Sequence, residues 1–200
     1  KSFFQFISQN EVVPVFFQCI YASASNPSES PELYEEVYRC LKTVYSTHIK
    51  SKNILFGADL GQFTSLFQQS LSCPNPYISS LFFRFSDDFD SFPMAVQFAF
   101  NEDEFIRHNG LAQLNQILNL RIEQFENSQL IELFKNLLTS YCQFHEEMSL
   151  KAITTLSSKT KLSLRCQFLP FIIELCNQVV NFDVIKCASY YVDISKTEEF

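Results

Sequence analysis

The near-absence of glycine is the feature that most constrains this sequence. Only three of its 200 residues are Gly. Tight hairpins and phosphate-binding loops depend on Gly, because a Cβ atom disfavours the backbone conformations that they need. This composition therefore argues against β-sandwiches and compact α/β enzymes. It favours helices joined by short polar turns, and the sequence predicts an all-α protein.

Several short segments carry the signals of helix ends. Ser30-Pro31-Glu32 and Asn75-Pro76 each place an N-capping residue before a proline at the first helical position. Asn101, with Glu104 three residues later, is typical of a capping box. His108-Asn109-Gly110 predicts a helix that ends in a left-handed cap.

Between these signals, apolar residues recur with the helical period of about 3.6 residues. One predicted helix has Leu33, Val37, Leu41 and Val44 on one face, with Tyr34, Tyr38 and Tyr45 beside them, and another has Leu130, Phe134, Leu137, Leu138 and Tyr141. Residues 188–192 are the one predicted strand, since Tyr and Val are concentrated there. Loops are expected at residues 25–30, 73–75, 86–92 and 123–127.

One helix pattern occurs four times along the chain. The copies are Val13-Phe16-Phe17-Ile20, Phe63-Leu66-Phe67-Leu71, Leu111-Leu114-Leu118 and Phe168-Phe171-Ile172-Leu175, and their starts lie 50, 48 and 57 residues apart. Two copies share a proline in the expected first turn, Pro14 and Pro170, and two closely follow a glycine, Gly61 and Gly110. Coincidence is the alternative, because every amphipathic helix shows this period. The pattern predicts repeat-like units at about 10–72, 76–120 and 128–180.

Residues 101–118 contain the pattern F-I-x-x-x-G-L-x-x-L-x-x-I-L, and residues 52–66 are a looser copy. This pattern resembles the sharp junction between helices in armadillo and HEAT repeats. The spacing here exceeds the usual repeat of about 40–47 residues, and residues 86–93 are irregular. The resemblance covers residues 10 to 180 and implies a right-handed α-solenoid that forms a single domain over residues 1–200. The general pattern of the sequence is also similar to that of helical regions in very large eukaryotic proteins such as BEACH-domain proteins, although no BEACH signature residues are present.

The charge and the cysteines restrict partners and compartment. A net charge of −7 disfavours binding to nucleic acid or to an anionic membrane surface. The most apolar run, residues 168–180, is too short to span a membrane and includes Glu174, Asn177 and Gln178. Seven cysteines without a C-x-x-C pair predict free thiols in a reducing compartment, so we expect a cytoplasmic protein. We also expect the chain to be a fragment of a longer one, since it begins at Lys1 without a signal peptide.

Few residues suggest chemistry. Cys142 and His145 are three residues apart, close to the spacing of zinc ligands, but no second Cys/His pair accompanies them. The alternative places Cys142 in the core and His145 at a helix end. His48 and His108 are expected near helix C-termini, and the sequence has neither a G-x-S-x-G elbow nor a phosphate-binding glycine loop. We therefore expect no catalytic site, no metal and no cofactor.

An acidic loop rich in aromatic residues is the candidate contact with a partner. It comprises Phe85, Asp87, Asp88, Phe89, Asp90 and Phe92. Such a loop anchors in a partner groove, or its rings tuck beneath it and close a repeat. The sequence as a whole predicts a protein–protein interaction scaffold that binds basic or polar peptides and neighbouring repeats of the same chain. The alternatives are a helical regulatory domain attached to a larger enzyme, such as a ubiquitin ligase or a GTPase regulator, and a stand-alone helical enzyme.

Overall fold

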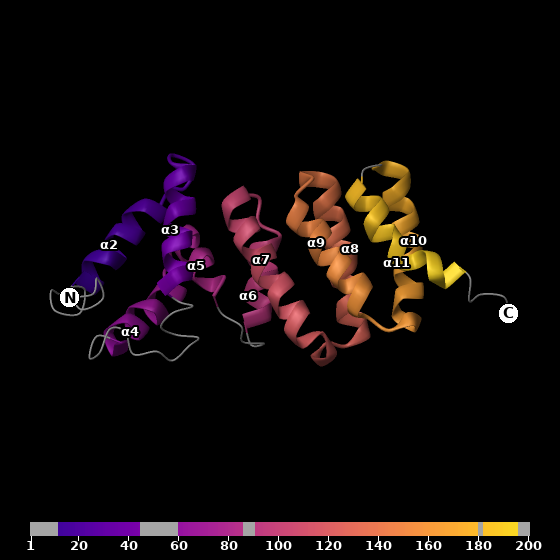
Figure 1. Cartoon of the computed structure of the whole chain (residues 1–200), viewed down its shortest axis with the longest axis horizontal. Helices are drawn as coiled ribbons and strands as arrows, with labels where there is room; N and C mark the ends of the chain where they lie inside the picture. The colour runs from indigo at the N-terminus through magenta and orange to yellow at the C-terminus, as the bar shows by residue number, and fades with distance from the viewer. Residues whose placement is uncertain (1–11, 45–59, 86–90, 180–181, 196–200) are drawn as a thin grey trace. The chain divides into compact units, whose positions relative to one another are not determined.

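The computed structural model describes residues 12–44, 60–85, 91–179 and 182–195, and every element within those ranges is a helix (Figure 1). The prediction of an all-α protein is confirmed. The chain forms two compact units, the first from residues 1–86 and 101–110 and the second from residues 87–100 and 111–200. None of the described helices is long and apolar enough to cross a lipid bilayer.

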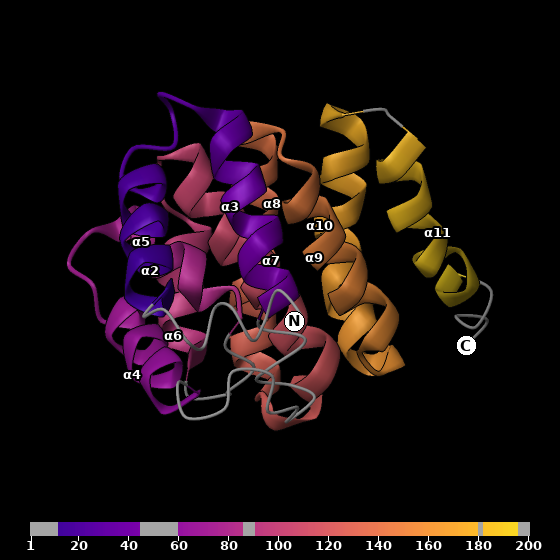
Figure 2. The same ribbon diagram turned by 60° about the vertical axis from the view of Figure 1, so that its left-hand side comes forward.

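The first unit contains α2 (Val12–Ala24), α3 (Pro31–Val44), α4 (Leu60–Leu71), α5 (Pro76–Phe83) and the first turns of α7 (Glu104–Arg121). Helix α2 packs against α3, α4 and α5, and α4 packs against α5 (Figure 2). The core is aromatic. The Phe17 ring stacks on Phe82 with centroids 5.7 Å apart, and Tyr34 meets Phe105 edge-on at 5.2 Å. These rings supply much of the apolar area that the first unit buries.

The second unit contains α6 (Phe92–Ala99), the rest of α7, the 3₁₀ turn η4 (Ile122–Gln124), α8 (Asn127–Phe144), α9 (Glu147–Lys159), α10 (Leu162–Gln178) and α11 (Phe182–Ser195). Helix α8 pairs with α9, and α10 pairs with α11 (Figure 1). Helix α8 also packs on α10, and α9 packs on α11. An up-and-down bundle would place consecutive helices α9 and α10 side by side. The observed contacts instead stack one helical hairpin on the next, in two layers.

Aliphatic and aromatic side chains fill the space between these hairpins. The predicted apolar face of α8 is confirmed, because Leu130, Phe134, Leu137, Leu138 and Tyr141 are all buried. The Phe134 ring lies parallel to the Phe168 ring of α10, with centroids 4.1 Å apart and planes 2° from parallel. This contact joins the first helices of the two hairpins.

Two predicted helix starts are confirmed and one cap differs. Helices α3 and α5 begin at the predicted prolines, and the Asn75 side chain accepts a hydrogen bond from the Tyr77 N–H at 2.9 Å. The capping box predicted for Asn101 and Glu104 is wrong. Asp103 caps α7, since its Oδ1 accepts hydrogen bonds from the N–H groups of Phe105 and Ile106.

The helix end predicted at residues 108–110 is also wrong, because α7 continues to Arg121. A glycine within a helix costs about 1 kcal/mol relative to alanine. Here Leu111, Leu114 and Leu118 follow Gly110 and are fully buried, so their burial offsets that cost. A break at Gly110 would have removed these side chains from the core.

The strand predicted at residues 188–192 is wrong as well, because the segment lies within α11. Val184, Cys187 and Tyr191 are buried at helical spacing in this helix. Contacts with α9 and α10 therefore override the strand preference of the Tyr-rich sequence.

Smaller departures concern single residues. Leu33 is 48% exposed, and the face of α3 that packs inward carries Tyr34, Val37, Tyr38 and Leu41 instead. Pro170 lies in the interior of α10 and not in its first turn, so the predicted match with Pro14 fails. The predicted loop at 123–127 is partly the turn η4.

Candidate functional site

The exposed side of α8 is the candidate site, because grooves border it on both sides. Lys135, Asn136, Thr139 and Gln143 lie exposed along this helix. Thr139 lines both grooves. Helix α8 therefore forms a polar ridge between two hollows of the second unit.

The first hollow, which we call the α8–α10 groove, has a volume of about 280 Å³. It is lined by Leu138, Thr139, Cys142, Phe171, Glu174, Leu175 and Gln178. Leu138 and Leu175 are buried, and the Phe171 ring is half-buried. The groove thus has an apolar floor and a polar rim.

The rim of this groove is a chain of hydrogen bonds. The Cys142 thiol donates to Oε1 of Gln178 at 3.4 Å, and Nε2 of Gln178 donates to Oε1 of Glu174 at 3.3 Å. Burial raises the pKa of the Cys142 thiol, and the negative charge of Glu174 raises it further. The thiol is therefore a neutral donor rather than a thiolate nucleophile. The carboxylate of Glu174 is the one charged group among the lining residues.

A cation from α8 contacts the aromatic ring of the same groove. The ammonium of Lys135 lies 5.1 Å from the centroid of the Phe171 ring. This distance is within the range over which a ring face attracts a cation. The face of the Phe171 ring is thus accessible to a cation.

The second hollow, the α6–α8 groove, lies on the other side of the α8 ridge and has a volume of about 290 Å³. It is lined by Phe100, Asn136, Thr139, Ser140, Gln143 and Phe144, none of which carries a charge. The Ser140 hydroxyl is buried and has no hydrogen-bond partner among the described residues. This groove is suited to uncharged polar groups.

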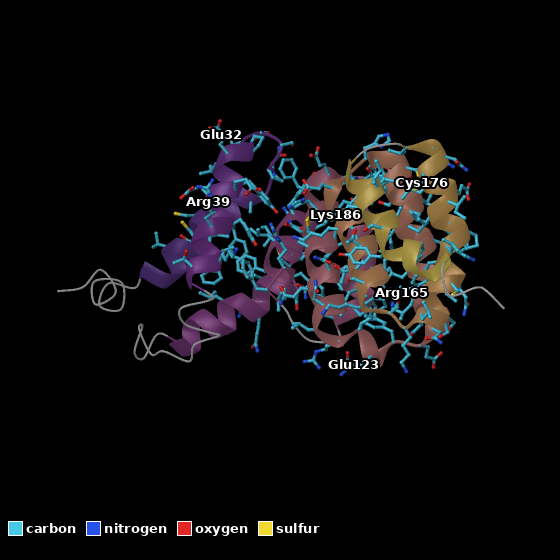
Figure 3. The ribbon with its side chains drawn as sticks, turned by 45° about the vertical axis from the view of Figure 1, so that its right-hand side comes forward. Glu32, Arg39, Glu123, Arg165, Cys176 and Lys186 are labelled. Carbon is cyan, nitrogen blue, oxygen red and sulfur yellow. The ribbon has the colours of Figure 1, made fainter. Side chains whose placement is uncertain are left out.

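A third hollow lies between α9 and α11 and has a volume of about 240 Å³. It is lined by Glu147, Leu150, Lys151, Thr154 and Lys186, and Lys186 is labelled on α11 in Figure 3. Two lysines and one glutamate give this α9–α11 groove the opposite sign of charge from the α8–α10 groove.

Two of the six residues of the predicted aromatic loop are described, and each packs within a different unit. Phe85 is only 6% exposed and stacks on Tyr38 in the first unit, with centroids 5.7 Å apart. Phe92 is half-buried and meets Phe125 edge-on at 4.6 Å in the second unit. Asp87, Asp88, Phe89 and Asp90 lie outside the described residues, so contact with a partner through this loop stays a prediction.

Cys142 and His145 do not converge on a common point. His145 ends α8 with a positive φ of 53°, as the alternative interpretation placed it, and its N–H donates to the Tyr141 carbonyl at 2.8 Å. Cys142 is half-buried rather than in the core, where the same interpretation placed it, and its thiol donates to Gln178. Within the described ranges, no three His, Cys, Asp or Glu side chains gather where they could hold a metal ion. His108 lies inside α7, and His48 is outside the described residues.

A buried polar network in the first unit was not predicted from the sequence. Asn109 donates from Nδ2 to the Tyr34 hydroxyl and, at 3.1 Å, to the Ser80 hydroxyl. The Arg84 guanidinium donates to Oδ1 of Asn109 at 3.3 Å and lies 3.6 Å from the centroid of the Tyr38 ring. Burial raises the pKa of Tyr34 to about 12, although the Asn109 hydrogen bond and the charge of Arg84 act against the shift. Since the members satisfy one another, the network holds α3, α5 and α7 together.

The position of Glu174 and Gln178 in the α8–α10 groove was not predicted from the sequence either. Glu174 and Gln178 are four residues apart on α10, which places them on one face of a helix. In the sequence they stood out only as interruptions of an apolar run. Comparison of the chain with protein-family models, with curated proteins and with solved structures finds no match.

Proposed function

We propose that this chain is a non-catalytic scaffold that binds a protein partner along the α8 ridge. The observation that supports the proposal is the stacking of the α8–α9 hairpin on the α10–α11 hairpin. Stacked hairpins place equivalent helices in one layer, and neighbouring helices of a layer border elongated grooves that suit a polypeptide. The α8–α10 groove lies between two such helices.

The same stacking favours an armadillo-like or HEAT-like solenoid as the architecture. In those repeats each helical pair contacts the next pair, first helix on first helix and second on second. The contacts of α8 with α10 and of α9 with α11 follow that order. We extend the proposal of helical repeats to the whole chain. The units predicted at about 10–72, 76–120 and 128–180 stay a prediction, and the last of them would divide α10 from α11, whereas α8–α9 and α10–α11 are the pairs that support the proposal.

The volumes of the grooves are compatible with the binding of side chains of a protein partner. Small-molecule pockets usually have volumes of about 300–1,000 Å³ and enclose most of their ligand. The three hollows of the second unit have volumes of about 280, 240 and 290 Å³. Such hollows suit individual side chains of a bound polypeptide.

We propose a reducing, cytoplasmic setting for this interaction. All seven cysteines are free thiols, and Cys19 and Cys40 are exposed. Exposed pairs of thiols are readily oxidised in secretory compartments but stay reduced in the cytosol. The net charge of −7 favours basic protein partners over nucleic acid.

A peptide-display selection against the full chain tests the proposal. Thr139→Trp introduces a large ring at the exposed position that the two α8 grooves share. Ser158→Trp makes the same change at an exposed position of α9 that lines none of the three grooves. We expect selected peptides to bind the wild type and Ser158→Trp equally, and to bind Thr139→Trp at least about tenfold more weakly.

Circular dichroism of both variants checks that their folds are unchanged. Selected peptides that bind Thr139→Trp as tightly as the wild type would overturn the proposal. A selection that enriches no binding peptide would overturn it too.

A further inference from the structure

We propose that the α8–α10 groove binds one lysine or arginine side chain of a protein partner, with its aliphatic stem on Leu138, Leu175 and Phe171 and its charge at Glu174. This inference rests on the proposed scaffold function and specifies the chemistry that the scaffold recognises. Three observations support it: the apolar floor and polar rim of the groove, the negative charge of Glu174, and the contact of the Lys135 ammonium with the Phe171 ring.

The groove matches a long amphipathic side chain. Its floor is apolar, and its polar groups lie on the rim at Thr139, Cys142, Glu174 and Gln178. Lysine and arginine have the same division, since their methylene stems bury against apolar surface while the charged head stays near water. A volume of about 280 Å³ leaves room for one such side chain.

The charge at the rim selects a cation. Glu174 is exposed, so its carboxylate stays solvated until a guest arrives. Gln178 donates to Oε1 of Glu174, and Cys142 in turn donates to Gln178. These two hydrogen bonds link the carboxylate to the other polar groups that line the groove, and the overall charge of −7 steers cations toward the protein.

Lys135 provides a precedent within the molecule. Its ammonium already lies beside the Phe171 ring, at 5.1 Å from the centroid. A guest lysine or arginine entering the groove would meet the same ring together with the Glu174 carboxylate. Because Lys135 carries the same charge as the guest, it would oppose binding while Glu174 favours it. Removing the charge of Lys135 should therefore raise the affinity for a basic side chain, and removing the charge of Glu174 should lower it.

The other two grooves provide contrasts. The α6–α8 groove has no charged lining residue, and the α9–α11 groove has two lysines beside Glu147. A basic side chain would gain no ion pair in the former and would meet like charges in the latter. Of the three grooves, the α8–α10 groove is therefore the one whose lining residues favour a cation.

The test titrates the full chain with blocked amino acids and follows the methyl signals of Leu138 and Leu175 by NMR. The probes are Nα-acetyl-lysine N-methylamide, its arginine counterpart, its norleucine counterpart, which keeps the stem without the charge, and its glutamate counterpart. We expect the two basic probes to shift both methyl signals and to bind at least about threefold more tightly than the norleucine probe. We expect the glutamate probe to bind most weakly.

Charge-removing variants then test the two opposed residues. Glu174→Gln should weaken binding of the lysine probe by about two- to fivefold, and Lys135→Gln should strengthen it by up to about twofold, as is usual for exposed charges. Glu123→Gln and Lys186→Gln make the same charge changes on η4 and α11, outside this groove, and should leave the affinity unchanged (Figure 3).

Equal binding of the lysine and norleucine probes would overturn the inference, and so would tighter binding of the glutamate probe with a loss on Lys135→Gln. Either result leaves the scaffold proposal standing if displayed peptides still fail to bind Thr139→Trp. If Thr139→Trp has no effect on displayed peptides, the scaffold proposal itself fails.

Discussion

Two buried amides on one helix show how differently the two units are built. Asn109 and Gln113 are one turn apart on α7, with Asn109 in the first unit and Gln113 in the second. Asn109 is 1% exposed and bonds to Tyr34, Ser80 and Arg84. Gln113 is 0% exposed, and neither atom of its amide has a partner among the described residues.

The contrast indicates what specifies each unit. A buried amide without a partner costs about 1–3 kcal/mol, whereas a satisfied one fixes the geometry of its neighbours. The first unit therefore depends on a closed polar network set among aromatic rings. The second unit also buries satisfied polar pairs, since the Thr155 hydroxyl donates to Oδ1 of Asn115 at 2.7 Å and the Ser157 and Tyr191 hydroxyls lie 2.6 Å apart. It differs in tolerating one fully buried amide, that of Gln113, without a partner among the described residues.

The largest loss of stability is expected in the second unit, when the ring of Phe134 is removed. Phe134→Ala deletes a fully buried ring that stacks on Phe168, and we expect a loss of about 3–5 kcal/mol in the free energy of unfolding. Urea denaturation followed by circular dichroism measures the loss. Hydrogen exchange should show faster opening of α8 to α11, and opening confined to α2 to α5 would contradict the prediction.

The corresponding break in the first unit removes the amide and not a ring. Asn109→Ala leaves the Tyr34 hydroxyl buried without its donor, and should lower the free energy of unfolding by about 1–3 kcal/mol. Adding Tyr34→Phe should cost less in this background than in the wild type, because the partner is already lost. Strictly additive losses in urea denaturation would show that the two side chains do not interact.

Alkaline pH sharpens the comparison, because it acts on the same tyrosine. The folded pKa of Tyr34 is raised to about 12 from an ordinary value of 10.0, mainly by burial. A raised folded pKa gives stability that is complete below pH 10 and is lost as the pH rises toward 12. The wild type should lose about 2–3 kcal/mol more than Tyr34→Phe over this range. Parallel pH profiles of the two proteins in urea denaturation would contradict this assignment.

Replacing the amide of Gln113 should raise the free energy of unfolding, whereas Asn109→Ala should lower it. Gln113→Met keeps nearly the same volume and removes a polar group that has no partner, so we expect stabilisation by about 1–2 kcal/mol. Gln116→Met is the matched control at a half-buried position of the same helix and should change little. Thermal denaturation measures both, and a destabilised Gln113→Met would remove the contrast between the units.

The smallest effect is expected at the surface of the first unit. Arg39, which is labelled in Figure 3, forms an ion pair of 3.2 Å with Glu36 on α3. Both side chains are more than half exposed. Arg39→Ala should change the free energy of unfolding by less than about 0.5 kcal/mol. A larger loss in urea denaturation would show that charges outside the buried network help to specify this unit.

The sequence predicted best what depends on neighbouring residues. Pro31 and Pro76 start helices because a capping residue precedes each and a proline lacks the N–H that would be unsatisfied there. The buried face of α8 followed from its period, since Phe134 and Leu137 recur at helical spacing. Such features are encoded within a few residues.

What depends on distant residues was not predictable in the same way. Asn109 next to Gly110 has the local signature of a helix end, but its side chain bonds to Tyr34, which lies 75 residues away. The α8–α10 groove exists because α8 packs on α10 as well as on α9, the next helix in the chain. A single helical pattern cannot reveal which neighbour its groove will face.

The bond between Tyr34 and Asn109 also constrains the order in which the chain becomes structured. Contacts in the second unit join hairpins that are close in sequence, an arrangement of low contact order that permits fast folding. The first unit is closed by a contact across 75 residues, and a ribosome must complete α7 through Asn109 before Tyr34 has its partner. During synthesis the polar network of α3 and α5 therefore closes only after the beginning of α7 has emerged, whereas α8 to α11 can assemble as each hairpin emerges.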